Sequence, residues 1–428
     1  MSLPKRVVDS VRRRAGAEAY GKGATFFLLS STVVNVSSFL FHMASSRLLG
    51  PTDYGSLSTL INMTNLIALP VGALQFAVTQ AVLEKSREGH RSITRLLRRT
   101  GLIGVLIVLA IFVFLSPIDS YFHMTSIWPM VFVALWIPFA LLSTLVQGVL
   151  LGEFKYSPVA TGILVGGGLL RLVIGVLLIY VGFGVTGATI ALLAGQIFTF
   201  LYVLFSARHF LARTPETSHL MVGFRHISIS IATFTGLTAF TAVDTFLSRH
   251  YFSPFYAGQY AAASIAAHVA LFFPSAVVMV SFPHMVGERE ISESSRQLIL
   301  QSLKMTTVLG VAVGVVFAIS PHLVTEFLFG SKFAPASTIL RVLLVQSVGL
   351  GVLTLLVAIQ LARRHWTSLL PLLGVGVAVL ATALHPTSFG GLADLMLVVT
   401  AIVVAVIGGS LGLAIRASSR RQRVAVTN

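Results

Sequence analysis

The chain has 428 residues, of which 55% are hydrophobic and only 10% are charged. Soluble globular proteins carry roughly 25% charged residues, so this composition excludes an ordinary soluble domain and favours a membrane protein. Cysteine is absent, which excludes disulfides, thiolate metal sites and a cysteine nucleophile.

Long apolar runs follow one another along the chain, separated by short polar loops. Runs of about 18 or more apolar residues are long enough to cross a bilayer as helices. The first run lacks a small-residue cleavage site, so we expect it to stay as a spanning helix. We predict an all-α polytopic membrane protein with twelve transmembrane helices at roughly 24–46, 55–82, 100–117, 128–151, 158–181, 185–206, 227–248, 257–284, 303–321, 336–361, 367–384 and 392–415.

The basic residues predict the orientation of these helices. With both termini in the cytoplasm, 24 of the 30 Lys and Arg fall in cytoplasmic segments, as the positive-inside rule requires. Only Arg47, Arg249 and Lys332 lie outside, and the remaining three, Arg171, Lys304 and Arg341, lie within or just inside helices. For Arg47, Arg249 and Arg341 we expect the side chain to extend to lipid headgroups. The net charge of +16 sits in short loops without interleaved aromatics, which indicates anionic lipids as partners and no nucleic acid.

Two segments about 200 residues apart share a pattern that predicts an internal repeat. Pro51 and Gly55 match Pro254 and Gly258 at a constant offset of 203. After one inserted residue the match continues at Pro70 with Pro274, Glu84 with Glu288 and Lys85 with Arg289. Each copy holds six helices, so both copies enter the membrane from the same side, and an axis along the membrane normal relates them.

This repeat predicts two six-helix lobes related by a pseudo-two-fold axis along the membrane normal. Lobes of this kind rock around a polar site at their interface, the alternating-access arrangement of transporters. The expected segments are a basic cytoplasmic N-terminal segment (1–23), an N-lobe (24–206), a cytoplasmic linker (207–226), a C-lobe (227–415) and a basic cytoplasmic tail (416–428).

Two ionisable residues at membrane depth are the first candidates for function, because charges are costly there. Asp244 lies roughly 7 Å below the external end of its helix, at 1.5 Å per residue. We interpret it either as a proton, cation or sugar site or as half of a structural ion pair with Arg341. Arg171 lies near the middle of its helix and is suited to bidentate binding of a diphosphate or acidic sugar. Its structural alternative is a clamp on helix carbonyls.

Arg341 and several other polar residues are candidates for the substrate or ion pathway. His42 and His268 have an ordinary pKa near neutral pH, although a hydrogen-bonded neutral imidazole is the commoner role in a bundle. Asn35, Asn65 and Gln75 are suited to line a sugar-binding cavity or to bond between helices. Pro70 and Pro274 are predicted to kink their helices, as hinges or as static bends.

No catalytic constellation is present in the sequence. It holds no Walker-type loop, no HExxH, no GxSxG and no external loop large enough for a catalytic domain. We therefore predict a secondary transporter and not an enzyme, with no catalytic residue, cofactor or metal site.

Four segments together resemble a known family. They are SRLLGPTDYGSLSTL from Ser46, LVQGVLLGEFKYSPVATGILVGGGLLRLVIGVLL from Leu145, AVDTFLSRHYFSPFYAGQYAAAS from Ala242 and LFGSKFAPASTILRVLLVQS from Leu328. In order and spacing the chain resembles polysaccharide exporters of the multidrug/oligosaccharidyl-lipid/polysaccharide (MOP) flippase superfamily, of the O-antigen or capsule type.

The resemblance implies a flippase in the cytoplasmic (inner) membrane of a prokaryote. Such a protein carries a polyprenyl-diphosphate-linked oligosaccharide to the outer leaflet for surface polysaccharide biosynthesis. Implied partners are this lipid-linked glycan, H⁺ or Na⁺ as the coupling ion, and a glycan polymerase or glycosyltransferases. The alternatives are a multidrug or cation antiporter of the same superfamily and a non-transporting membrane component of a glycan-assembly complex.

Overall fold

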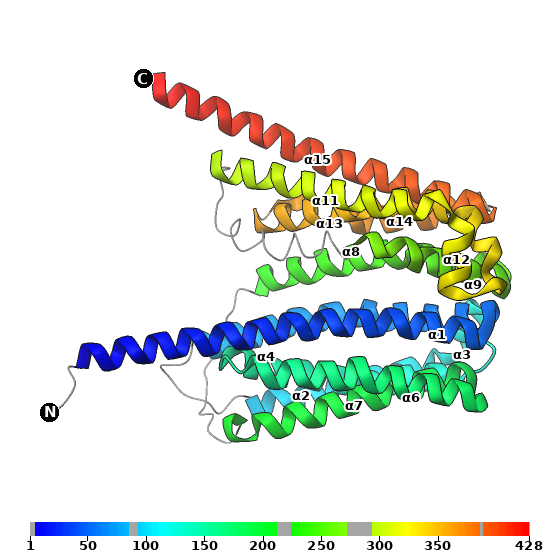
Figure 1. Cartoon of the computed structure of the whole chain (residues 1–428), viewed down its shortest axis with the longest axis horizontal. Helices are drawn as coiled ribbons and strands as arrows, with labels where there is room; N and C mark the ends of the chain where they lie inside the picture. The colour runs from blue at the N-terminus through cyan, green and yellow to red at the C-terminus, as the bar shows by residue number, and fades with distance from the viewer. Residues whose placement is uncertain are drawn as a thin grey trace. The chain divides into compact units, whose positions relative to one another are not determined.

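A computed structural model describes residues 5–84, 93–211, 224–271, 293–363, 365–385 and 388–427. Within these ranges the regular structure is entirely helical, with no strand, as the apolar runs predict (Figure 1).

The helices of the first half of the chain begin at Lys5. In order they are α1 (Lys5–Glu84), α2 (Ile93–Val113), α3 (Leu115–Phe122), α4 (Trp128–Gly152), α5 (Tyr156–Gly162), the π-helix η1 (Ile163–Leu170), α6 (Arg171–Leu178), the π-helix η2 (Ile179–Phe183) and α7 (Gly184–Leu211).

The helices of the second half begin at Phe224. In order they are α8 (Phe224–Tyr251), α9 (Pro254–His268), the 3₁₀ turn η3 (Val269–Leu271), α11 (Glu293–Ile319), α12 (Pro321–Phe329), η4 (Ser331–Ala336, also 3₁₀), α13 (Ser337–Ala362), η5 (Trp366–Leu369, 3₁₀), α14 (Leu370–Leu384) and α15 (Phe389–Thr427).

Eight helical stretches among the described residues are long and apolar enough to cross a membrane. Two of them, Thr25–Ala68 and Tyr156–His209, each contain an interruption and so hold two crossings. The bent pair Leu97–Val113 and Leu115–Phe122 adds a further crossing, and α9 leads into residues outside the described part. The protein is thus an all-α membrane protein with about twelve spanning helices.

Glycines interrupt the two longest helical stretches. Gly50 has φ 72° and ψ 176°, and Pro51 follows it at the first position of the next helical segment. Gly182 and Gly184 also have positive φ, 103° and 54°. Only glycine adopts such dihedrals without a steric penalty. Breaks of one to three residues therefore separate consecutive helical segments at positions where we expected longer loops.

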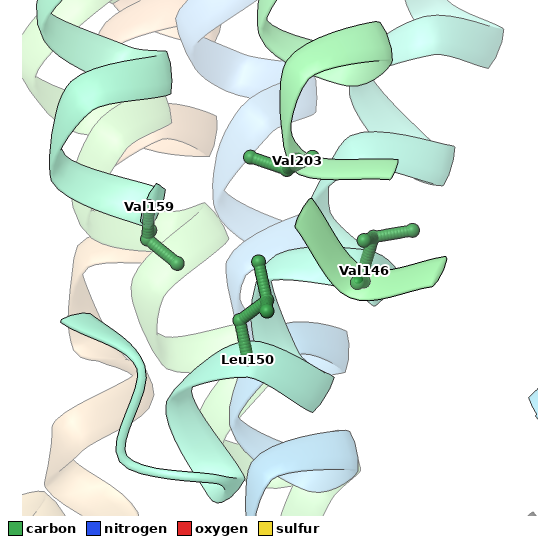
Figure 2. Packing of buried hydrophobic residues seen from close by; sticks show 5 residues of the cluster. Val146, Leu150, Val159 and Val203 are labelled. Atoms are coloured by element: carbon green, nitrogen blue, oxygen red, sulfur yellow. The ribbon is translucent and has the colours of Figure 1, made fainter. Parts of the chain in front are cut away.

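The chain forms two compact units. The first comprises Met1–Leu48, Val71–Asp119 and Ser126–Ile227. In it α4 packs against α2 and α7, and η1 and α6 pack along α7. Branched apolar side chains fill the α4–α5–α7 contact, where Val146, Leu150, Val159 and Val203 converge (Figure 2).

The second unit comprises Leu49–Pro70, Ser120–Thr125 and Ser228–Asn428. In it α13 packs against α9, α11 and α15. Two short segments of the first half of the chain therefore pack with the second half, which the lobe boundaries 24–206 and 227–415 do not anticipate. The expected linker 207–226 lies largely outside the described residues, and α1 and α15 extend into the expected basic N-terminal segment and tail.

Large apolar side chains are exposed along many of the helices. Leu102, Tyr180, Val316, Leu373 and Leu413 are examples. Lipid tails solvate such side chains as well as a protein core does, so these exposed side chains are what a membrane-spanning fold requires.

Candidate functional site

Asp244 is the buried acid of the second unit. It lies in α8 with 1% of its surface exposed. Its Oδ1 accepts hydrogen bonds from the backbone N–H of Thr245 at 2.7 Å and from the Thr245 hydroxyl at 3.3 Å. The Tyr260 hydroxyl of α9 is buried close to the Asp244 carboxyl.

The ion pair that we considered between Asp244 and Arg341 does not form. Arg341 is exposed on α13, and its Nε donates to the Ala318 carbonyl at 3.3 Å. Within the described ranges no cation pairs with Asp244. Buried carboxyl groups usually have a cationic partner, because an isolated buried charge is costly. A buried carboxyl without one is therefore a candidate for a functional role.

Arg171 is the intramembrane cation of the first unit. It begins α6 directly after the π-helix η1. Its guanidinium carbon lies 4.9 Å from the centroid of the Phe41 ring, and His42 is within electrostatic range. The clamp on helix carbonyls does not form: in the described part of the chain no carbonyl or carboxylate binds this guanidinium.

Small residues allow α7 to approach the π-helix before Arg171. A Cβ added at Gly166 would overlap the carbonyl oxygen of Gly195 and the Thr199 hydroxyl. The Thr199 hydroxyl donates to the Gly162 and Gly195 carbonyls at 3.0 and 2.9 Å. π-helices of this kind are often found at functional sites, and here the packing fixes the backbone that carries Arg171.

The other predicted site residues are distributed over both units. Asn35 and Asn65 are exposed, whereas His42, His268 and Gln75 are half-buried. Pro70 lies within helical backbone, and Pro274 lies outside the described residues. The structure thus brings together Arg171 and His42, while the pathway and hinge roles stay predictions.

Arg249 was wrongly expected to extend to lipid headgroups. It is 1% exposed, at the end of α8, and donates three hydrogen bonds to residues of the first half of the chain. The position of Arg249 in the sequence indicates that it lies near a helix end, but not whether its side chain points toward lipid or toward protein.

The sequence analysis also missed the Gln259 side chain. It is buried, donates to the Lys332 carbonyl at 2.8 Å and accepts from the Ala336 N–H at 3.2 Å.

The two glycines matched by the internal repeat lie against each other. A Cβ on Gly55 would approach the Gly258 nitrogen to 2.9 Å and its Cα to 3.0 Å, and a Cβ on Gly258 would overlap the Pro51 carbonyl. Only glycine permits this backbone contact.

Among the described residues no group of three or more His, Asp or Glu side chains is arranged to hold a metal ion.

Comparison with solved structures shows the fold. An inward-facing multidrug resistance MATE family transporter of the MOP superfamily aligns with TM-score 0.75 and 16% identity, over 90% of this chain and 96% of that chain. The lipid II flippase MurJ, in an inward closed conformation, aligns with TM-score 0.72 and 14% identity, over 90% and 87%. A MOP superfamily transporter from Pyrococcus furiosus aligns with TM-score 0.60 and 16% identity, over 94% and 96%.

Comparison of the sequence shows the family. No curated protein matches the chain significantly. A family model described as polysaccharide biosynthesis protein matches residues 45–338, well over half of the chain. The match spans three of the four segments that carried the resemblance and part of the fourth. The chain therefore belongs to the polysaccharide biosynthesis protein family and has the transporter fold of the MOP superfamily.

Proposed function

We propose that this protein is a flippase that moves a polyprenyl-diphosphate-linked oligosaccharide across the cytoplasmic membrane of a prokaryote. It works by alternating access, is driven by a proton or sodium gradient, and has both termini in the cytoplasm. The MOP transporter fold supports transport, and the polysaccharide biosynthesis family supports a glycan substrate. The likeness to a lipid II flippase supports a lipid-linked one.

The observation that carries the proposal is the environment of Arg171 in its predicted membrane-spanning helix. Arg171 touches the Phe41 ring but binds no carboxylate or carbonyl among the described residues. Its planar group is pre-shaped to bind a phosphate through two hydrogen bonds. A diphosphate between lipid and glycan supplies the anion that this site lacks.

A multidrug or cation antiporter is the second candidate, because the MATE transporters share the fold. Organic cations favour a cavity with several acids. This sequence has 14 acids in total, and Asp244 is the only one that our helix assignment places at membrane depth. Arg171 repels a cationic substrate, so the charge at membrane depth favours an anionic headgroup.

Reconstitution in liposomes tests the proposal. A polyprenyl-diphosphate oligosaccharide with a fluorophore on its sugar is placed in both leaflets, and a membrane-impermeant quencher reports the rate of exchange with and without an imposed gradient. We expect the wild type to exchange the headgroup and Arg171→Gln to be at least about tenfold slower, since charge-assisted bonds of about 1.5–3 kcal/mol are lost. Arg98→Gln, which changes an exposed arginine of α2, serves as the control.

Each other outcome identifies an alternative. A wild type that moves organic cations but not the glycan supports the antiporter. A wild type that moves neither, yet co-purifies with a glycan polymerase or glycosyltransferase, supports the non-transporting component. Equal glycan exchange by wild type and Arg171→Gln removes the role of Arg171.

A further inference from the structure

One face of α1 packs against η1 and α6 within the first unit. A Cβ added at Gly168 would lie 3.4 Å from the Val34 side chain. The Phe41 ring lies against Gly175 and against the Arg171 guanidinium. The residues of this face follow one another at spacings of four, three and four, and we call them the packed row: Ser30, Val34, Ser37 and Phe41.

The two faces of α1 that flank the packed row are both accessible, but their chemistry is opposite. Each is offset from the packed row by one residue, which is about 100° around a helix of 3.6 residues per turn. On one flank all four side chains are apolar and between 44% and 61% exposed, as expected for contact with lipid tails. We call this flank the apolar row: Leu29, Val33, Val36 and Leu40.

The other flank carries only polar side chains. This polar row consists of Ser31, Asn35, Ser38 and His42, of which Asn35 is exposed and the others are half-buried. Asn35 lies at the middle of the predicted crossing 24–46, and in the described part of the chain neither Asn35 nor Ser38 makes a side-chain hydrogen bond. Because a polar group without a hydrogen bond is costly in hydrocarbon, this flank faces water or a polar ligand and not lipid.

The polar row meets the Arg171 site at one end. His42 follows Phe41, whose ring centroid lies 4.9 Å from the guanidinium carbon, and is within electrostatic range of Arg171. Toward the external end the next position of the row is Ser45, which is fully buried. In the other direction the row continues to Ser31, roughly 16 Å from His42 at 1.5 Å per residue. A ligand held at Arg171 can therefore follow the row only toward the cytoplasmic end of α1.

We propose that the polar row binds the sugar units next to the diphosphate of the substrate. With the diphosphate at Arg171, these sugars lie along α1 toward its cytoplasmic end and exchange hydrogen bonds with the Asn35 amide and the Ser38 hydroxyl. Both side chains donate and accept, as sugar hydroxyls do, so the row suits a neutral, polyhydroxylated ligand. This inference rests on the proposed function and deepens it by naming the part of the substrate that is recognised and the residues that recognise it.

The natural absence of cysteine allows a test of the two flanks. Single cysteines replace Asn35 and Ser38 in the polar row, and Val36 and Leu40 in the apolar row at similar depth. A charged methanethiosulfonate reagent is added to opened membranes, where it reaches both faces. We expect the two polar-row cysteines to react at least about tenfold faster than the two apolar-row cysteines, because the reactive thiolate forms in water and not in lipid.

Protection by ligand then tests whether the row binds sugar. The lipid-linked oligosaccharide extracted from the source cells is compared with polyprenyl diphosphate that carries no sugar. We expect the glycan-bearing lipid to slow the labelling of Ser38→Cys at least about threefold when it is in excess over its Kd. The sugar-free lipid should leave this rate unchanged, since it ends at Arg171.

A second substitution tests the role of the Asn35 amide. We expect Asn35→Leu, added to Ser38→Cys, to raise the lipid concentration that gives half-maximal protection about fivefold, the usual effect of losing one neutral hydrogen bond. Val36→Leu, on the apolar row, is the matched control and should leave that concentration unchanged. Thermal unfolding in detergent shows which variants are folded, and Ser31→Cys replaces Ser38→Cys as the reporter if the latter does not fold.

The outcomes separate this inference from the proposed function. Labelling of the polar row no faster than that of the apolar row overturns the inference, since the polar row would then face lipid. Equal protection by the two lipids, or protection by neither, overturns it as well, because no sugar would lie on the row. A protein that exchanges the glycan in liposomes without sugar-dependent protection contradicts the inference alone, whereas one that shows the protection but exchanges no glycan contradicts the proposed function alone.

Discussion

The Asp244 carboxyl is buried to the same degree as the apolar core around it. Its Thr245 hydrogen bonds offset part of the desolvation cost, but no positive charge within the described ranges offsets the rest. An ionised carboxylate buried in this way is strongly disfavoured, so the neutral acid or a bound cation is favoured in this conformation. A carboxyl that is neutral or cation-bound when buried can release its proton or cation when a conformational change exposes it to water, and this property suits Asp244 to ion exchange.

We predict that Asp244→Asn abolishes the stimulation of transport by an ion gradient while the protein stays folded. Asparagine keeps an oxygen for the Thr245 bonds but cannot exchange a proton. Gradient-dependent and gradient-independent rates are compared in the liposome assay, together with the midpoint of thermal unfolding. Asp394→Asn, an exposed acid in α15, should behave as wild type. Full gradient stimulation in the Asp244→Asn variant would show that another group couples the ion.

At the scale of elements, the sequence predicted which segments are helical better than it predicted their close contacts. The sequence holds three Gly-x-x-x-Gly spacings, at Gly162–Gly166, Gly310–Gly314 and Gly408–Gly412, yet of these only Gly162 and Gly166 pack tightly against a neighbouring helix. Gly310 and Gly314 make ordinary van der Waals contacts with Val348, and an added Cβ at Gly412 would meet no atom within 4 Å. Spacing places two glycines on one helix face, but only tertiary structure shows whether that face meets protein or lipid.

This contrast predicts that alanine destabilises the fold at one of two adjacent glycines of η1 and is tolerated at the other. Gly166→Ala places a methyl group against the Gly195 carbonyl and should destabilise the fold by about 1–3 kcal/mol, the usual cost of overpacking. At Gly167 a new Cβ would meet only the Ile163 side chain, at 3.8 Å, so Gly167→Ala should be tolerated. Thermal unfolding in detergent measures both. Equal midpoints for the two variants would mean that α7 does not pack on η1 as described.

For the whole molecule, the sequence predicted an all-helical membrane protein with about twelve crossings and its relation to polysaccharide biosynthesis proteins, because hydropathy and motif spacing follow directly from the residue order. It did not predict that residues 49–70 and 120–125 pack with the second half of the chain. It also placed Arg249 in lipid headgroups. Both differences concern contacts between residues that are far apart in the sequence. Hydropathy, charge and spacing are local patterns, and they do not show which distant segments will pack together.

The orientation of the molecule gives the last prediction. If basic loops face the cytoplasm, Lys155, between α4 and α5, lies inside, and Ser253, between α8 and α9, lies outside; both side chains are exposed. A cysteine at Ser253 should react with an impermeant maleimide in intact cells, and one at Lys155 should react only after the membrane is permeabilised. Because helix count and loop charge set the topology together, the reverse labelling pattern would invert every loop at once and place the end of α8 that carries Arg249 on the cytoplasmic face. Labelling of both positions in intact cells would instead mean that an even number of crossings, and not the predicted three, lies between Lys155 and Ser253.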